Sequence, residues 1–131
     1  MKRFLIEAAA VAGTALLLGS SVLVARQDPA TATAPREIQV VAKRFAFEPS
    51  RIEATEGERI RLLVRSADAV HGIEIKRHKV NRLIPRGEKP VVIDFVAGAP
   101  GTYEILCTEE CGDGHDTMKG TLVVEAKPKA R

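Results

Sequence analysis

Two cysteines, a histidine and a methionine lie within one twelve-residue segment near the end of the sequence. Cys107 and Cys111 are the only cysteines in the chain, and His115 and Met118 follow Cys111 at intervals of four and seven residues. Thiolate and thioether sulfurs are soft ligands, and together with imidazole they favour copper over hard cations such as Mg²⁺. The segment therefore predicts a copper site.

A second imidazole is expected from His71, which lies far upstream. His71 shares its alternation with Ile73 in a stretch of period two, so its side chain should point to the core side of a strand. Cys107 has the same relation to Ile105. Since His71 and Cys107 each stand at a strand end, we expect a pocket at one pole of the fold. His78 lies in a basic run that reads as a solvated edge, and we expect no metal role for it.

The ligand set allows more than one metal site. Cys111, His115 and Met118 with upstream His71 form a mononuclear blue-copper set, in which Cys107 is surplus. A second thiolate lets two sulfurs bridge two coppers, each with one histidine. A Cys107–Cys111 disulfide leaves the histidine and methionine spacing unexplained, and a two-Cys, two-His structural zinc site leaves Met118 without a role.

Size and composition narrow the function. The chain has 131 residues, which supports one domain and excludes a large enzyme with its own cofactor domain. The net charge is +3, and the aromatic residues are four Phe and one Tyr, with no Trp. A stacking platform for nucleic acid needs several exposed rings. We therefore expect no nucleic-acid partner.

The first 35 residues differ in kind from the rest. Lys2 and Arg3 precede an apolar run over residues 8–25. As a helix, this run would span about 27 Å, just short of a bilayer core of about 30 Å. This pattern predicts either a retained membrane anchor or a cleaved signal peptide, followed by a short linker up to residue 35. Both alternatives place residues 36–131, a domain with a short charged tail, on the periplasmic side.

The domain shows a hydrophobic period of two and no long helical pattern. Turn signals rich in Gly and Pro separate short apolar stretches. This pattern predicts an all-β antiparallel sandwich with Greek-key connections. The expected strands cover residues 38–42, 59–65, 71–75, 91–96, 103–107 and 122–124.

Several motifs resemble one family. The string C-x-E-x-C-G-x-x-H-x-x-M is similar to the dicopper motif of cytochrome c oxidase subunit II. Four further stretches resemble that family's sequence around the site, and the single apolar segment resembles its short, single-anchor bacterial form. The matching stretches are residues 107–118, 66–72, 43–49, 101–103 and 118–124.

The resemblance implies a cupredoxin-like fold and a binuclear, mixed-valence copper centre of the kind called CuA. It also assigns six residues to the two copper ions. Cys107 and Cys111 would bridge them, His71 and His115 would be terminal ligands, Met118 a weak axial ligand, and Glu109 a ligand through its backbone carbonyl.

The function that follows is one-electron transfer without bond-breaking chemistry, so no catalytic residues are expected. By resemblance, the acceptor is a haem in a haem-copper oxidase core subunit. Acidic residues Glu110, Asp113 and Asp116 either keep the loop solvated or form a rim that attracts a basic donor such as cytochrome c. A free-standing periplasmic CuA electron carrier and a copper-binding or copper-delivery protein remain alternatives.

Overall fold

Residues 33–130 are described by the computed structural model. The apolar run expected to be an anchor or signal peptide lies outside the described residues. Between residues 33 and 130, no helix is both long enough and apolar enough to cross a membrane.

Short strands and two 3-10 turns account for the regular structure of this part of the chain, as the period-two pattern predicts. The strands are β1 (Arg36–Lys43), β2 (Ala46–Glu48), β3 (Arg51–Thr55), β4 (Arg59–Ser66), β5 (His71–Ile75), β6 (Val80–Ile84), β7 (Gly87–Val96), β8 (Gly101–Leu106) and β9 (Lys119–Glu125); the 3-10 turns are η1 (Lys76–His78) and η2 (His115–Thr117).

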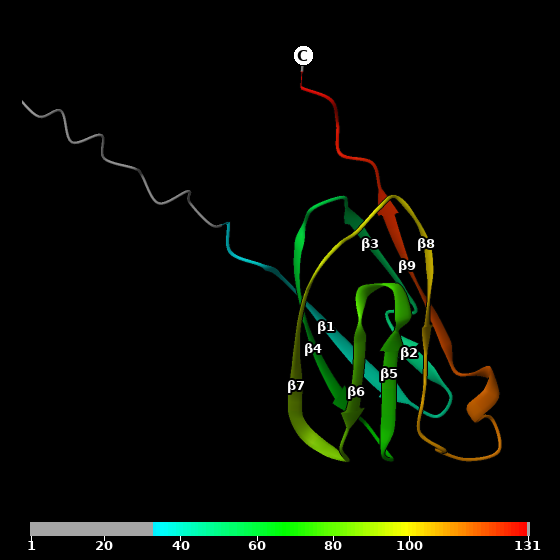
Figure 1. Ribbon diagram of the computed structural model, residues 1–131. Helices are drawn as coiled ribbons and strands as arrows, with labels where there is room; N and C mark the ends of the chain where they lie inside the picture. Colours follow the sequence, from blue (N-terminus) through cyan, green and yellow to red (C-terminus); the bar gives the residue numbers. More distant parts are fainter. Residues whose placement is uncertain (1–32, 131) are drawn as a thin grey trace, which may run out of the picture. The chain divides into compact units, whose positions relative to one another are not determined.

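The strands form two sheets that pack face to face (Figure 1). One sheet has the order β2-β1-β4-β7, and the other has the order β3-β9-β8-β5-β6. Strand β4 shows how the sequence builds the core, because Ile60, Leu62 and Val64 are fully buried while their neighbours are not. Burying one such side chain contributes about 1.5–3 kcal/mol. The predicted all-β sandwich is therefore confirmed.

The expected purely antiparallel pairing is wrong for two strand pairs. β1 pairs with β4 in parallel, and β3 pairs with β9 in parallel. Antiparallel neighbours can be joined by a hairpin, whereas parallel neighbours need a crossover connection. Here the chain leaves the first sheet after β2, adds β3 to the second sheet, and returns as β4. The alternation of apolar residues cannot reveal this, because it is the same in both kinds of pair.

The sequence pattern did not predict β6, and it misplaced His78. Only the end residues of β6, Val80 and Ile84, are buried, so the strand has no alternation to detect.

His78 ends η1 and is not on a solvated edge. Its Nε2 accepts a hydrogen bond from the Gly98 amide at 3.0 Å, and its ring packs edge-on against Tyr103 at a centroid distance of 4.7 Å.

The topology brings four segments to one end of the sandwich, which we call the ligand pole. β5 begins there and β8 ends there, followed by the loop that leads into β9 (Figure 1). The turn between β1 and β2 and the segment between β4 and β5 complete the group. Residues far apart in the sequence, such as Arg44, His71 and Cys111, are thereby placed together.

Candidate metal centre

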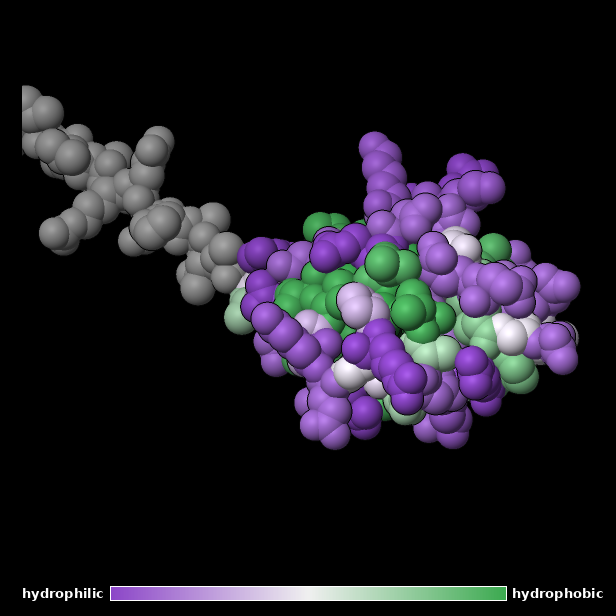
Figure 2. All heavy atoms as spheres, turned by 90° about the horizontal axis from the view of Figure 1, so that it is seen from below, coloured by the Kyte–Doolittle hydropathy of each residue, from purple (hydrophilic) through white to green (hydrophobic). Residues whose placement is uncertain are grey.

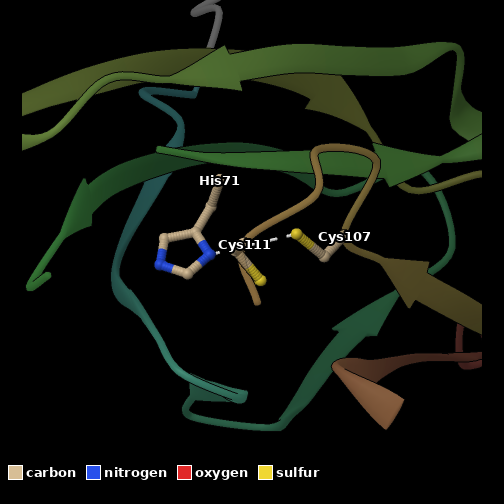
Figure 3. A group of neighbouring side chains, drawn as sticks. All are labelled: His71, Cys107 and Cys111. Carbon is tan, nitrogen blue, oxygen red and sulfur yellow. Dashed lines mark hydrogen bonds between the residues drawn. The ribbon is translucent and has the colours of Figure 1, made fainter. Parts of the chain in front are cut away.

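His71 and both cysteines converge at the ligand pole. The His71 ring nitrogens and the Sγ atoms of Cys107 and Cys111 provide ligand atoms that all lie within 4.8 Å of one another. His71 is completely buried, and the two cysteines are 8% and 4% exposed. Figure 3 shows the His71 ring and the Cys107 thiol facing each other, with Cys111 between them on the loop. The inward orientation predicted from the alternation is confirmed for His71 and Cys107.

The loop after β8 brings three more donor groups to the two sulfurs. His115 Nδ1 lies 3.9 Å from Cys111 Sγ, and Met118 Sδ lies 3.8 Å from the same sulfur. The Glu109 carbonyl oxygen lies 3.3 Å from Cys107 Sγ, while the Glu109 side chain is exposed. All six residues singled out in the sequence are therefore near the two sulfurs, and Glu109 presents its backbone.

Short backbone bonds fix the shape of this loop. The His115 amide donates to the Gly112 carbonyl at 2.9 Å, and the Met118 amide donates to the His115 carbonyl at 3.0 Å, which closes η2. Gly112 has φ +136°, a conformation that other residues rarely adopt. A Cβ on Gly114 would lie 2.4 Å from the Phe45 ring. Gly112 and Gly114 thus allow the loop to turn tightly and to pack against Phe45.

The His71 ring is oriented from the segment between β4 and β5. His71 Nε2 lies 2.8 Å from Asp68 Oδ1, so Nδ1 is the nitrogen that faces Cys107, at 3.9 Å from its sulfur. Burial raises the pKa of Asp68, but hydrogen bonds from the Arg44 amide and from His71 outweigh it, and the pKa lies below its usual value. The carboxylate is therefore ionised and accepts the His71 Nε2 proton.

The Cys111 thiol is in an environment that disfavours a free thiolate. Burial raises the pKa of Cys111 to about 11, and the neighbouring Cys107 adds to the shift. Both cysteines are free thiols in the structure. A cation between the sulfurs would compensate the buried negative charge, so metal binding would displace the thiol protons.

The spacing of the donor atoms is compatible with a bound metal ion. Bonds of about 2.0–2.3 Å from a four-coordinate metal place neighbouring ligand atoms about 3.5 Å apart. The donor pairs described above lie 3.3–3.9 Å apart. Two thiols, two imidazoles, a thioether and a carbonyl form a soft donor set, which is consistent with copper. Met118, which a zinc site would not use, is buried beside Cys111.

Sequence reasoning missed one residue that contacts this loop. The Arg44 side chain donates from Nε to the Cys111 carbonyl at 2.6 Å, and Arg44 lies in the turn between β1 and β2. No periodicity marks such a contact, because it joins residues 67 positions apart across the ligand pole.

Comparison with known proteins places this arrangement in a family. Residues 10–124 match the family described as "Cupredoxin-like domain". Cytochrome c oxidase subunit 2 of Thermus thermophilus is 35% identical over 103 residues, which cover 75% of this chain and 76% of that protein. A second sequence of that subunit from the same species shows the same identity, but the match covers only 61% of its length.

Solved structures agree with the fold. A chain of a haem-copper terminal oxidase dimer is similar with a TM-score of 0.63 and 25% identity, covering 72% of this chain and 68% of that one. The periplasmic domain of subunit II of the Bradyrhizobium japonicum cytochrome oxidase has a TM-score of 0.62 at 17% identity, covering 70% of this chain and 84% of that one. The resemblance found in the motifs is confirmed, and the chain belongs to the cupredoxin family as a relative of cytochrome c oxidase subunit II.

Proposed function

We propose that this protein is an electron-transfer domain with a binuclear CuA centre. It would accept single electrons from a donor such as cytochrome c and pass them to a haem-copper oxidase core. Cys107 and Cys111 would bridge two copper ions, with His71 and His115 as terminal ligands. Met118 and the Glu109 carbonyl would complete the two sites.

The position of Cys107 carries this proposal. A mononuclear blue-copper site needs one thiolate, which Cys111 supplies beside His115 and Met118. Cys107 nevertheless lies in the same buried cluster, and its sulfur faces His71 Nδ1 and the Glu109 carbonyl. Each sulfur thus has its own histidine and its own weak donor, which is the division that two metal ions require.

In electron transfer, the protein would hold the ligand groups rigidly and shield them from water. A dicopper centre, when bound, supplies a one-electron acceptor and donor. His71 is fixed by Asp68, and the loop carrying Cys111 and His115 is closed by its own backbone bonds. Met118 is 1% exposed, so its thioether lies in the core. Donors anchored in this way move little between redox states, and the buried environment tunes the potential.

The surface of the ligand pole suits a redox partner. Glu110, Asp113 and Asp116 are exposed on the loop, and they form what we call the acidic rim. Phe45 and Val70 are exposed apolar side chains in the segments beside the site. Figure 2 shows hydrophobic surface framed by hydrophilic side chains at this end. A basic donor would be attracted by the rim, as expected for a cytochrome c.

The relatives support a place in a respiratory complex. The similar proteins include cytochrome c oxidase subunit 2 and a chain of a haem-copper oxidase, so the proposed acceptor is an oxidase core subunit. We propose that residues 36–131 form the copper domain with its charged tail on the periplasmic side. Residues 1–35 would serve as a membrane anchor or a signal peptide with its linker.

Copper counting tests the proposed centre. The purified chain, loaded with copper under reducing conditions, should bind two copper ions. After one-electron oxidation to the mixed-valence state, its paramagnetic resonance spectrum should show one unpaired electron coupled equally to two copper nuclei. Binding of one copper, with coupling to a single nucleus, would contradict the binuclear centre and favour a blue-copper protein.

Purification from native membranes tests the proposed partner. An oxidase subunit should comigrate with haem in mild detergent. A free-standing CuA carrier would separate from haem and still cycle reversibly between redox states. A copper-delivery protein would instead lose its copper to an acceptor during such cycles.

A further inference from the structure

Arg44 contacts both the ligand loop and the residue that orients His71. Its side-chain Nε donates to the carbonyl oxygen of Cys111 at 2.6 Å. Its backbone amide donates to Asp68 Oδ2 at 2.8 Å. The side chain of Arg44 therefore contacts the ligand loop, and its backbone contacts the residue that orients His71.

The contact between Arg44 Nε and the Cys111 carbonyl influences the position of the Cys111 sulfur. Cys111 precedes Gly112, whose φ of +136° is a conformation that other residues rarely adopt. Holding the carbonyl of Cys111 restrains the peptide plane between these two residues, and with it the backbone from which the Cys111 side chain extends. A hydrogen bond from a charged donor is stronger than one between neutral groups, so this restraint is substantial.

The contact between the Arg44 amide and Asp68 influences the orientation of the His71 ring. Asp68 accepts from the Arg44 amide through one carboxylate oxygen and from His71 Nε2 through the other. The carboxylate cannot rotate without losing one of the two bonds. The turn between β1 and β2 therefore helps to keep His71 Nδ1 directed at Cys107.

The neighbouring residue strengthens the same link. A Cβ added to Gly112 would meet the Phe45 ring at 3.2 Å and Arg44 Nε at 3.6 Å. Arg44 and Phe45 thus cover the ligand loop together, one by a hydrogen bond and the other by its ring.

We infer that Arg44 is a positioning residue that couples the two halves of the copper site. It sets the Cys111 peptide through its guanidinium and supports the Asp68–His71 pair through its amide. This inference rests on the proposed copper centre for its redox consequences. Its consequence for the thiols does not depend on copper.

The guanidinium also adds a fixed positive charge beside the Cys111 peptide. Reduction adds one electron to the site, and a nearby positive charge favours the state with more negative charge. Removing the charge should therefore lower the reduction potential. Because Arg44 is exposed, added salt should diminish this effect.

Three variants of the full chain separate the side-chain hydrogen bond of Arg44 from its charge, while the backbone amide that contacts Asp68 is kept in all of them. Arg44→Met removes the hydrogen bond and the charge, while Arg44→Lys keeps the charge without the Nε donor. Arg65→Met is the matched control for charge. Arg65 is exposed near the end of β4, and between residues 33 and 130 its side chain forms no ion pair. Unfolding curves would establish that each variant is folded.

The first readout uses the copper-free protein and a thiol reagent. Arg44→Met should react several-fold faster at its cysteines than the parent, because the Cys111 peptide is no longer held, whereas Arg65→Met should match the parent. Equal rates in Arg44→Met and Arg65→Met would overturn the positioning role. This result is independent of whether the proposed centre is correct.

The second readout uses the copper-loaded protein. Loss of a residue that supports metal ligands typically weakens metal affinity about 10- to 100-fold. Arg44→Met should release copper at least about 10-fold faster and have a lower potential, and Arg44→Lys should recover the potential more fully than the copper retention. If the parent binds copper and Arg44→Met behaves like Arg65→Met, the inference fails and the proposed function stands. If the parent binds no copper, the proposed function fails.

Discussion

Asp68 directs His71 toward the sulfur of Cys107. The carboxylate accepts from His71 Nε2 at 2.8 Å, and His71 Nδ1 faces Cys107 Sγ at 3.9 Å. A metal ligand of this kind commonly has its second ring nitrogen held by a carboxylate, which fixes the tautomer and the ring orientation. The orientation of His71 as a metal ligand therefore depends on Asp68 as well as on its position in β5.

Replacing Asp68 should weaken copper binding without unfolding the domain. Asp68→Ala removes the acceptor and should lower copper affinity about 10- to 100-fold. Asp68→Asn keeps a carbonyl acceptor in nearly the same place and should lose less. Competition with a copper chelator measures both. Equal affinity in the parent and Asp68→Ala would show that core packing alone orients the ring.

The two cysteines should not be equivalent. Cys107→Ser leaves His71, Cys111, His115 and Met118, so it should bind one copper and acquire an intense blue-copper absorption. Cys111→Ser removes the sulfur closest to both His115 and Met118 and should lose the intense thiolate colour. Copper analysis and visible spectra distinguish the variants. Identical behaviour would contradict the division of donors between the two sulfurs.

Gly114 is required by Phe45 rather than by the backbone. Its φ is −101°, which any residue can adopt, but an added Cβ would lie 2.4 Å from the Phe45 ring. Gly114→Ala should destabilise the copper-free protein by about 1–3 kcal/mol, as overpacking does. Denaturant unfolding measures the free energy of unfolding.

A second substitution and a control identify the cause. Phe45→Ala in the Gly114→Ala background should recover part of the lost stability, because the clashing ring is gone. At Gly98 an added Cβ would meet only the His78 ring, at an ordinary 3.5 Å from Nε2. Gly98→Ala should therefore cost little. An additive double mutant would rule out contact with Phe45 as the reason.

The sequence indicated the ligand set well because its signal is local. Five of the six residues lie within twelve positions, and the inward direction of His71 and Cys107 follows from alternation along their strands. The strands with clear alternation, such as β4, were predicted for the same reason. Their burial depends on neighbours along the chain, not on which strand lies beside them.

The remaining features depend on contacts between distant segments. The parallel pairing of β1 with β4 results from a crossover through the other sheet, which leaves no mark on either strand. Arg44 reaches Cys111 across the ligand pole, and its turn looks like any polar connection. His78 looked solvated because it follows Lys76 and Arg77, yet its ring turns inward between two aromatic side chains.

His78 should make the copper-free protein less stable in mild acid. Burial lowers the pKa of His78, and its Nδ1 is buried without a hydrogen-bond partner among residues 33–130. As pH falls through about 6.5, the unfolded chain takes up this proton and the folded protein does not. The contribution of His78 to the free energy of unfolding is therefore complete above this pH. It is lost as the pH falls from about 6.5 toward the lower pKa of His78 in the folded protein.

A variant that cannot titrate tests this pH dependence. His78→Gln keeps an acceptor for the Gly98 amide and removes the imidazole. Its urea midpoint should change less between pH 7 and pH 5 than that of the parent. The carboxyls with lowered pKa, Asp68, Glu58 and Asp94, act at lower pH. Equal losses in both proteins over this range would assign the effect to other groups.

The acidic rim should govern encounter with a basic donor. Glu110, Asp113 and Asp116 are exposed on the loop that carries Cys111 and His115. Opposite charges speed association by roughly 10- to 1000-fold, and salt screens them beyond about 8 Å at physiological ionic strength. Reduction of the copper-loaded protein by a basic cytochrome should therefore slow steeply as salt rises.

Neutral amides at the rim separate charge from structure. Replacing Glu110, Asp113 and Asp116 together by Gln, Asn and Asn should flatten the salt dependence while the copper spectrum stays unchanged. Neutralising Glu37, Glu48 and Glu88, which are exposed outside the ligand loop, removes the same charge and is the control. It should leave the salt dependence as in the parent. A parent rate that does not respond to salt would instead assign docking to the apolar surface of the ligand pole, where Phe45 and Val70 are exposed.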